Sequence, residues 1–116
     1  MAESLYFNPE CSKCRSADAI LQERGHTVAQ IRYLEEPPTV DDLRRLMDLL
    51  GIDDPRQMLR VGEPAYAELG LTDVPADELL AAVTDHPMLL ERPIFVRNGR
   101  AVIARPPERV LELLDD

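Results

Sequence analysis

Residues 4–25 read SLYFNPECSKCRSADAILQERG, and this stretch decides the fold. Residues 4–7 are typical of a β-strand, which ends at Asn8 and Pro9 because proline cannot donate to a strand ladder. In the residues that follow, apolar side chains recur at the spacing i, i+3, i+4, and Gly25 stands where a helix would be capped at its C-terminus. The chain therefore begins with a strand that leads directly into a helix.

The next segments continue this unit and then interrupt it. Residues 27–33 carry β-branched and aromatic side chains, which favour a second strand. Pro37 and Pro38 break the strand pattern, and Thr39 is a good N-cap for a following helix. From about 39 to 90, apolar residues recur at helical spacing between prolines and glycines, so we predict that this whole segment is helical.

The last quarter of the chain returns to a strand pattern. Residues 94–97 and 100–103 are largely apolar, and they are separated by Asn98 and Gly99, the strongest short signal for a β-hairpin. A final helix is predicted over residues 108–114, with prolines at its start.

The order of the predicted elements is a βαβ half, then helices, then a ββα half. Two such halves around one four-stranded mixed sheet form the thioredoxin-like arrangement. We therefore predict an α/β protein with a thioredoxin-like fold and a helical insertion at about 39–90. A chain of 116 residues fits one compact domain, and we expect residues 1–116 to form it.

The composition excludes several classes of function. Thirteen Lys and Arg residues against 22 Asp and Glu residues give a net charge of −9, which repels nucleic acid and anionic membranes. The longest uninterrupted apolar run covers only residues 79–83, whereas a membrane-spanning helix needs about 20 residues. Residues 1–4 carry neither the basic nor the apolar segment of a secretion signal. We therefore expect a cytoplasmic monomer that binds neither nucleic acid nor a membrane.

Cys11 and Cys14 are the only cysteines, and they lie where the first strand leads into the first helix. Free N–H groups and the positive end of the helix dipole stabilise a thiolate at Cys11 more than at Cys14, which favours redox or nucleophilic chemistry. At i and i+3 the two sulfurs share a face, so a disulfide between them is feasible. The alternative is a pair of buried structural cysteines. A metal site is not expected, since the only histidines, His26 and His86, lack the spacing of zinc ligands.

Three arginines have settings that suit an anion beside this thiolate. Arg60 ends a short helical segment, and Arg92 and Arg105 each precede a proline. Guanidinium groups offer forked donors that match tetrahedral oxyanions, although each arginine alone could equally be a solvated surface residue. In a thioredoxin-like sheet the segment before the third strand lies beside the helix start, which would bring Arg92 to Cys11. Pro93 is the candidate for a structural cis proline, because X–Pro bonds adopt cis readily.

Seven motifs occur in order along the chain. They are YFNPECS at 6–12, YLEEPP at 33–38, MLR at 58–60, ELGL at 68–71, HP at 86–87, ERPI at 91–94 and RPPE at 105–108. Together they closely resemble the glutaredoxin-coupled arsenate reductases, the ArsC family. The resemblance extends from about residue 4 to residue 114.

The resemblance implies an activity and roles for the site residues. In this family a cysteine thiolate, here Cys11, attacks arsenate that is held by arginines, here Arg60, Arg92 and Arg105. Glutathione then attacks the thiol–arsenate adduct as a co-substrate, and glutaredoxin removes the glutathione, which releases arsenite. No metal and no bound organic cofactor is implied. The implied partners are arsenate or a similar oxyanion, glutathione and glutaredoxin, with thioredoxin as an alternative reductant.

Two positions depart from the family pattern. Phe7 stands where the family commonly has a histidine that helps to keep the thiolate. Cys14 stands where many members have serine or another residue without a thiol. Cys14 is therefore a candidate resolving cysteine, which would attack Cys11 within the protein and bypass glutathione.

Two alternative functions stay open. One is a general thiol-disulfide oxidoreductase that uses the cysteine pair. The other is a redox-sensing transcription regulator like Spx, a member of the same superfamily that shares the Cys-x-x-Cys-Arg motif at 11–15 and Arg-Pro-Ile at 92–94. The Arg-Pro pair at 105–106 and the net charge of −9 favour the reductase over the regulator.

Overall fold

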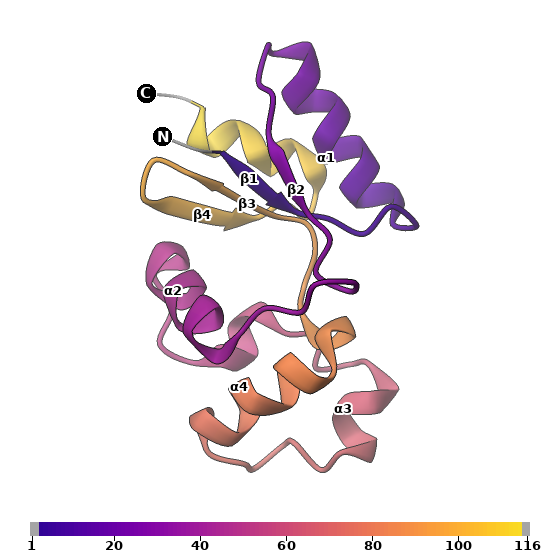
Figure 1. Cartoon of the computed structure of the whole chain (residues 1–116), viewed down its shortest axis with the longest axis vertical. Helices are drawn as coiled ribbons and strands as arrows, with labels where there is room; N and C mark the ends of the chain where they lie inside the picture. The colour runs from indigo at the N-terminus through magenta and orange to yellow at the C-terminus, as the bar shows by residue number, and fades with distance from the viewer. Residues whose placement is uncertain (1–2, 115–116) are drawn as a thin grey trace. The chain divides into compact units, whose positions relative to one another are not determined.

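A computed structural model describes residues 3–114, and the chain divides into two compact units, residues 1–36 with 92–116 and residues 37–91 (Figure 1). The first unit contains β1 (Ser4–Tyr6), α1 (Ser12–Glu23), β2 (Ala29–Ile31), β3 (Ile94–Arg97), β4 (Arg100–Ile103) and the 3-10 helix η3 (Pro107–Leu113). The second unit contains α2 (Val40–Leu50), α3 (Pro64–Glu68), α4 (Ala76–Asp85) and the 3-10 helices η1 (Pro55–Met58) and η2 (Pro87–Leu89). That the chain forms one domain stays a prediction.

The first unit is built on a four-stranded mixed sheet with the strand order β2-β1-β3-β4. β1 pairs parallel to β2 and antiparallel to β3, and β3 pairs antiparallel to β4. The predicted βαβ and ββα halves of a thioredoxin-like fold are therefore confirmed. β2 is shorter than predicted because the chain turns after Ile31, whose carbonyl accepts the Tyr33 N–H at 2.9 Å.

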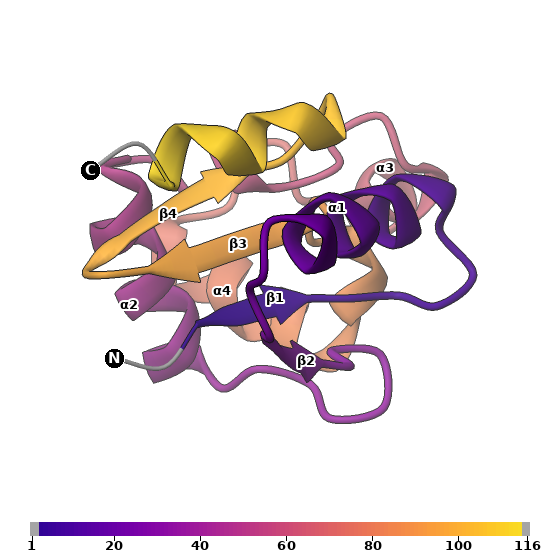
Figure 2. The same cartoon turned by 90° about the horizontal axis from the view of Figure 1, so that it is seen from above.

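The core of the first unit lies between the sheet and two helices. α1 and η3 lie side by side on one face of the sheet (Figure 2). Leu5 and Phe95 are opposite each other on neighbouring strands, and both side chains are fully buried. The core cluster consists of Leu5, Phe7, Cys14, Ala17, Leu21, Phe95, Val102, Ala104, Val110 and Leu113. Because Phe7 and Cys14 belong to it, the packed core reaches the start of α1.

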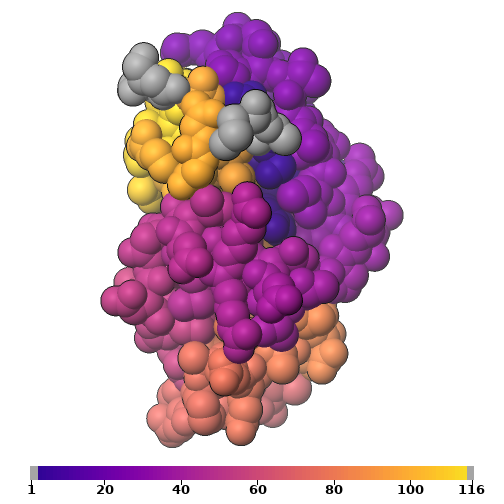
Figure 3. Space-filling view, turned by 60° about the vertical axis from the view of Figure 1, so that its left-hand side comes forward, coloured from indigo at the N-terminus to yellow at the C-terminus, as the bar shows by residue number. Residues whose placement is uncertain are grey.

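β3 and β4 form the predicted hairpin, which lies beside η3 on the surface of the first unit (Figure 3). Asn98 and Gly99 have φ angles of 52° and 75°, as the favoured two-residue hairpin turn requires. The final helix is of the 3-10 type. Its buried side chains Val110 and Leu113 are three residues apart, which suits three residues per turn.

The second unit consists of helices joined by turns and loops, and the prediction that it is all helical is wrong in these connections and at one β-bridge. Leu59 and Leu90 have extended backbones and form an antiparallel bridge. The Arg60 N–H donates to the Leu89 carbonyl at 2.7 Å beside this bridge. Both leucines are buried, and helical spacing cannot reveal a pairing between such distant residues. Within residues 3–114, no helix has the length and apolar character that crossing a membrane needs.

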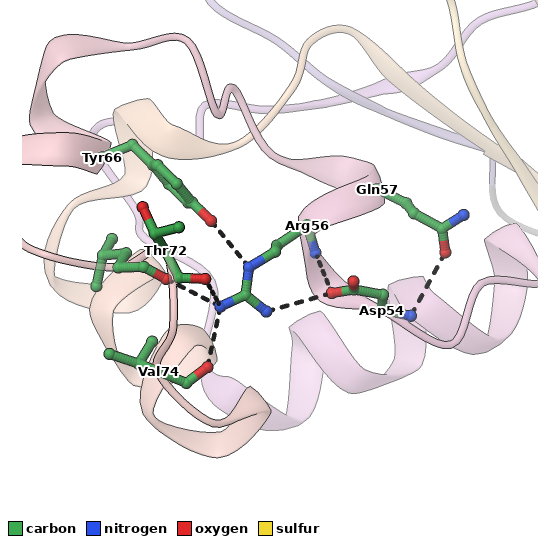
Figure 4. A network of polar contacts seen from close by, with 7 residues as sticks. Asp54, Arg56, Gln57, Tyr66, Thr72 and Val74 are labelled. Atoms are coloured by element: carbon green, nitrogen blue, oxygen red, sulfur yellow. Dashed lines mark hydrogen bonds and ion pairs between the residues drawn. The ribbon is translucent and has the colours of Figure 1, made fainter.

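Arg56 holds several segments of the second unit together (Figure 4). Its guanidinium donates to the Tyr66 hydroxyl at 2.8 Å and to the carbonyls of Leu71, Thr72 and Val74 at 2.9, 3.0 and 2.9 Å. A partly buried carbonyl without a hydrogen bond is destabilising, so this one side chain stabilises the loop that precedes α4. Arg56 is thus a structural arginine.

Candidate active site

The loop between β1 and α1 positions Cys11 at the start of the helix. The Phe7 N–H donates to the Ile31 carbonyl at 2.9 Å and continues the strand pairing into the loop. The Asn8 side-chain oxygen accepts the Glu10 N–H at 3.0 Å, and the Asn8 carbonyl accepts the Cys11 N–H at 3.0 Å. Turns of this kind order a loop locally. Cys11 is thereby fixed as the N-cap residue of α1, with a partly exposed side chain.

Cys11 is the more acidic of the two thiols. Burial raises the pKa of Cys11, but the backbone N–H and the thiol of Cys14 and the N–H of Lys13 stabilise the thiolate. The positive charge of Arg92 lowers the pKa of Cys11 as well. The resulting pKa lies below the ordinary value, so more of the nucleophilic thiolate is present at neutral pH.

Cys14 has the opposite setting. Its side chain is fully buried in the core, and this burial raises the pKa of Cys14 to about 12. The neighbouring Cys11 raises this pKa too, because two negative charges side by side are unfavourable. Cys14 therefore keeps its proton and acts as an S–H donor toward Cys11. Both cysteines are free thiols.

Arg92 and Arg105 meet where the β3–β4 hairpin ends. The Ala104 N–H donates to the Pro93 carbonyl at 2.9 Å and extends the pairing of the two strands, which places the two arginines opposite each other. Nη1 of Arg105 donates to the Arg92 carbonyl at 2.9 Å. The charge of Arg92 acts on Cys11, and the Arg105 guanidinium lies at the Arg92 carbonyl in the same unit.

Both of these arginines precede a cis peptide bond. The Arg92–Pro93 bond is cis, as expected for Pro93 from the sequence. The Arg105–Pro106 bond is also cis, which the sequence did not predict.

Arg60 lies in the second unit, where neighbouring residues hold its guanidinium. Nη2 forms an ion pair with Glu63 Oε2 at 2.9 Å, and Nη1 donates to the Met88 carbonyl at 3.4 Å. A guanidinium carries five N–H donors, so these contacts do not use its full capacity. Glu63 is a partner of Arg60 that the sequence did not predict, although opposite charges three residues apart are a recognisable signal. That Arg60 acts together with Cys11 stays a prediction.

Phe7 cannot take part in the chemistry of the thiolate. Its side chain is 5 % exposed and packs in the core, and a phenyl ring has no hydrogen-bond donor to offer. Stabilisation of the Cys11 thiolate therefore depends on the start of α1, on the Cys14 thiol and on Arg92. Within the described part of the chain, no cluster of three or more His, Cys, Asp or Glu residues could hold a metal ion.

The fold and the site together define a class of protein. A thioredoxin-like sheet carries a cysteine pair at a helix start, with one thiol acidic and accessible and the other buried and protonated. This arrangement is typical of proteins that work by thiol chemistry. Within that class, the chain belongs to the ArsC family, whose profile matches residues 6–113.

Individual relatives agree with this assignment. The protein named arsenate reductase from Neisseria meningitidis is 42 % identical, with 95 % of this chain and 96 % of the relative aligned. The solved structure of the arsenate reductase from Vibrio cholerae is 45 % identical, covers 97 % of this chain and 98 % of its own, and superposes with a TM-score of 0.93. The uncharacterized protein YfgD from Escherichia coli is 44 % identical, with 95 % of this chain and 94 % of the relative aligned. The resemblance to the ArsC family is therefore confirmed.

Proposed function

We propose that this protein is a thiol-dependent arsenate reductase. The observation that carries the proposal is the Cys11 thiol, whose pKa is lowered at the start of α1 and next to Arg92. The name arsenate reductase, which relatives at 42 % and 45 % identity carry, supports arsenate as the oxyanion.

The three arginines bind the substrate. Arg92 and Arg105 supply guanidinium groups from the first unit, and Arg60 supplies a third from the second. A cluster of this kind is needed because the net charge of −9 would otherwise repel an anion. Forked N–H donors match a tetrahedral oxyanion, and the backbone N–H groups at the helix start add further donors.

The reaction begins when the Cys11 sulfur attacks arsenic. An S–As bond forms, an As–O bond breaks, and the oxygen leaves as hydroxide or water while arsenic stays As(V). Glutathione then attacks the arsenic of the adduct, an As–S bond forms, and a second oxygen leaves as water. A glutaredoxin thiol attacks the glutathione sulfur, and the electrons of that As–S bond reduce As(V) to As(III) while a glutathione–glutaredoxin disulfide forms. Water then displaces arsenite from Cys11, which regains its free thiol.

The cofactor requirement and the cellular compartment follow from the use of thiols as electron donors. Thiols supply the electrons, so the protein needs no metal and no bound organic cofactor, and glutathione is a co-substrate. Both cysteines must be reduced before each turnover, which favours the cytoplasm over an oxidising compartment. We propose that the protein works as a monomer, without nucleic acid or a membrane.

The test is arsenite production from arsenate with glutathione and glutaredoxin, compared with thioredoxin as the only reductant. We expect turnover with glutathione and glutaredoxin. Arg60→Lys should raise the KM for arsenate about tenfold, because it loses a charge-assisted fork worth about 1.5–3 kcal/mol. The matched control is Arg45→Lys, at an exposed arginine of α2. No arsenite with either reductant, from protein whose Cys11 still reacts with iodoacetamide, would contradict the proposal.

The cysteine pair favours a second candidate, a general thiol-disulfide oxidoreductase. This candidate is supported by the pairing of the accessible Cys11 thiol, whose pKa is lowered, with the buried Cys14 thiol. That activity needs no oxyanion site. If it were the main activity, reduction of a small disulfide would be fast, and Arg60→Lys would leave its rate unchanged.

A further inference from the structure

We propose that Cys14 is a resolving thiol that releases arsenite without glutathione. The inference rests on the proposed arsenate chemistry. Once Cys11 carries arsenic, the Cys14 sulfur attacks the Cys11 sulfur, and a Cys11–Cys14 disulfide forms. The Cys11–arsenic adduct then breaks down to arsenite by a second route, besides attack by glutathione.

The helix start holds the two sulfurs in a suitable geometry. Cys11 is the N-cap residue, and its carbonyl accepts the Arg15 N–H at 3.1 Å, so the helical path begins at Cys11. Cα atoms at i and i+3 of a helix are about 5 Å apart, within the range of about 4.4–6.8 Å that disulfides span. The Cys14 thiol lies close enough to lower the pKa of Cys11 by favouring its thiolate. Little movement is needed for a bond between them.

The burial of Cys14 gives the reaction its direction. Cys14 is fully buried, whereas Cys11 is partly exposed, so arsenate and external thiols reach only Cys11. When an external thiol later attacks the disulfide at Cys11, Cys14 is the leaving group. Burial raises the pKa of Cys14, which slows its departure, and the backbone N–H of Asn8 and the charge of Arg92 offset part of this cost by favouring the thiolate. The buried thiol therefore acts only on its neighbour.

The resolving step balances in atoms and electrons. The Cys14 sulfur forms an S–S bond with Cys11 while the S–As bond breaks, and both electrons of that bond go to arsenic. The Cys14 proton passes to an oxygen on arsenic and leaves with the arsenite. As(V) gains two electrons and becomes As(III), and the two thiols are oxidised to one disulfide. No co-reactant is required until the disulfide is reduced.

A single-turnover experiment tests this step. Fully reduced protein is mixed with arsenate without added thiol, and arsenite, free thiols and intact mass are measured. For the wild type we expect arsenite equivalent to the protein, loss of both thiols, and a mass lower by two hydrogens. Cys14→Ala should give at least about tenfold less arsenite, because the nucleophile of the second step is missing.

Controls separate this role from packing. Cys14→Ser is measured beside Cys14→Ala, because a buried side chain is changed and one variant alone could fail to fold. Glutathione and glutaredoxin should restore turnover in both variants, and that rescue shows an intact site. The readout is thus a change in which reductant is needed, which a purely structural cysteine would not cause.

The outcomes are distinct. Equal arsenite from the wild type and Cys14→Ala without added thiol would overturn the resolving role. Wild-type protein that makes arsenite only with glutathione would also overturn it, and would leave the proposed function intact. No arsenite from the wild type under either condition would count against arsenate reduction itself, and would overturn the resolving step with it.

Discussion

The two longest helices of the molecule begin in different ways. α2 begins with a capping box, in which the Thr39 hydroxyl accepts the Asp42 N–H at 3.1 Å and the Asp42 carboxylate accepts the Thr39 N–H at 3.0 Å. Asp41 adds another negative charge to its first turn. α1, which lies wholly within the described residues, begins at Cys11 with no side-chain cap hydrogen bond and no acidic residue in its first turn.

The start of α2 stabilises the helix, whereas the start of α1 stabilises a reactive thiolate. In α2 the N–H groups of Thr39 and Asp42 are satisfied by side chains of its own first turn, and a cap of this kind contributes about 1 kcal/mol. In α1 the N–H groups of Lys13 and Cys14 lower the pKa of Cys11, and free N–H groups at a helix start are the donors that the proposed arsenate would meet. Carboxylates there would raise the pKa of the thiol and repel arsenate. The missing cap of α1 is thus a condition for its chemistry.

The largest expected effect comes from Cys11→Ser. Serine is a preferred N-cap residue, but its hydroxyl stays protonated at neutral pH and is a poor nucleophile. Arsenate reduction should fall at least about 10³-fold, while the free energy of unfolding should stay equal or rise by up to about 1 kcal/mol. Turnover and urea unfolding are measured on the same preparation. Loss of stability together with activity would mean that the sulfur is structural.

A smaller effect is expected for Arg92→Gln. The charge of Arg92 lowers the pKa of Cys11, so its removal raises that pKa and leaves less thiolate at neutral pH. Alkylation by iodoacetamide should become slower at pH 7, and its midpoint should move to higher pH. We expect kcat/KM for arsenate to fall about 10²-fold.

The matched control for this variant is Arg24→Gln, at an exposed arginine on the other end of α1. It should leave the midpoint of alkylation unchanged, because a solvated charge a helix length away is screened. Equal shifts in the two variants would refute a specific action of Arg92.

A variant at the start of α2 should change the stability of the protein but not the reactivity of Cys11. Thr39→Ala removes the hydroxyl that accepts the Asp42 N–H, so the free energy of unfolding should fall by about 1 kcal/mol. The alkylation rate of Cys11 and the KM for arsenate should not change at temperatures where the variant is folded. Urea unfolding measures the loss of stability, and the rate of alkylation measures the reactivity of Cys11. A slower alkylation would show that the two helix starts are not independent.

The sequence predicts the parts of this comparison that depend on local signals. The strand pattern at residues 4–7, Pro9 and the Cys-x-x-Cys motif together predict that Cys11 lies at a helix start. The pair Asn98 and Gly99 predicts the hairpin. Both predictions succeed because each sequence signal extends over only a few neighbouring residues. Contacts between distant segments are different. The bridge of Leu59 with Leu90 and the bond from Arg105 to the Arg92 carbonyl arise only when strands and loops pack, so no spacing in the chain reveals them.

The smallest expected effect tests whether side-chain charge in the first turn of α1 contributes to the site. Lys13 stands two residues after the N-cap of α1, the place that Asp41 holds in α2. Lys13→Asp puts a carboxylate there but keeps the backbone N–H that stabilises the Cys11 thiolate. A carboxylate at this position opposes the helix dipole's stabilisation of a thiolate, so the pKa of Cys11 should rise. The thiolate fraction at pH 7 then falls, and alkylation slows by a few-fold at most. A midpoint that does not move, measured at low ionic strength, would mean that backbone donors and Arg92 set the pKa of Cys11 and that the first turn of α1 tolerates acidic side chains.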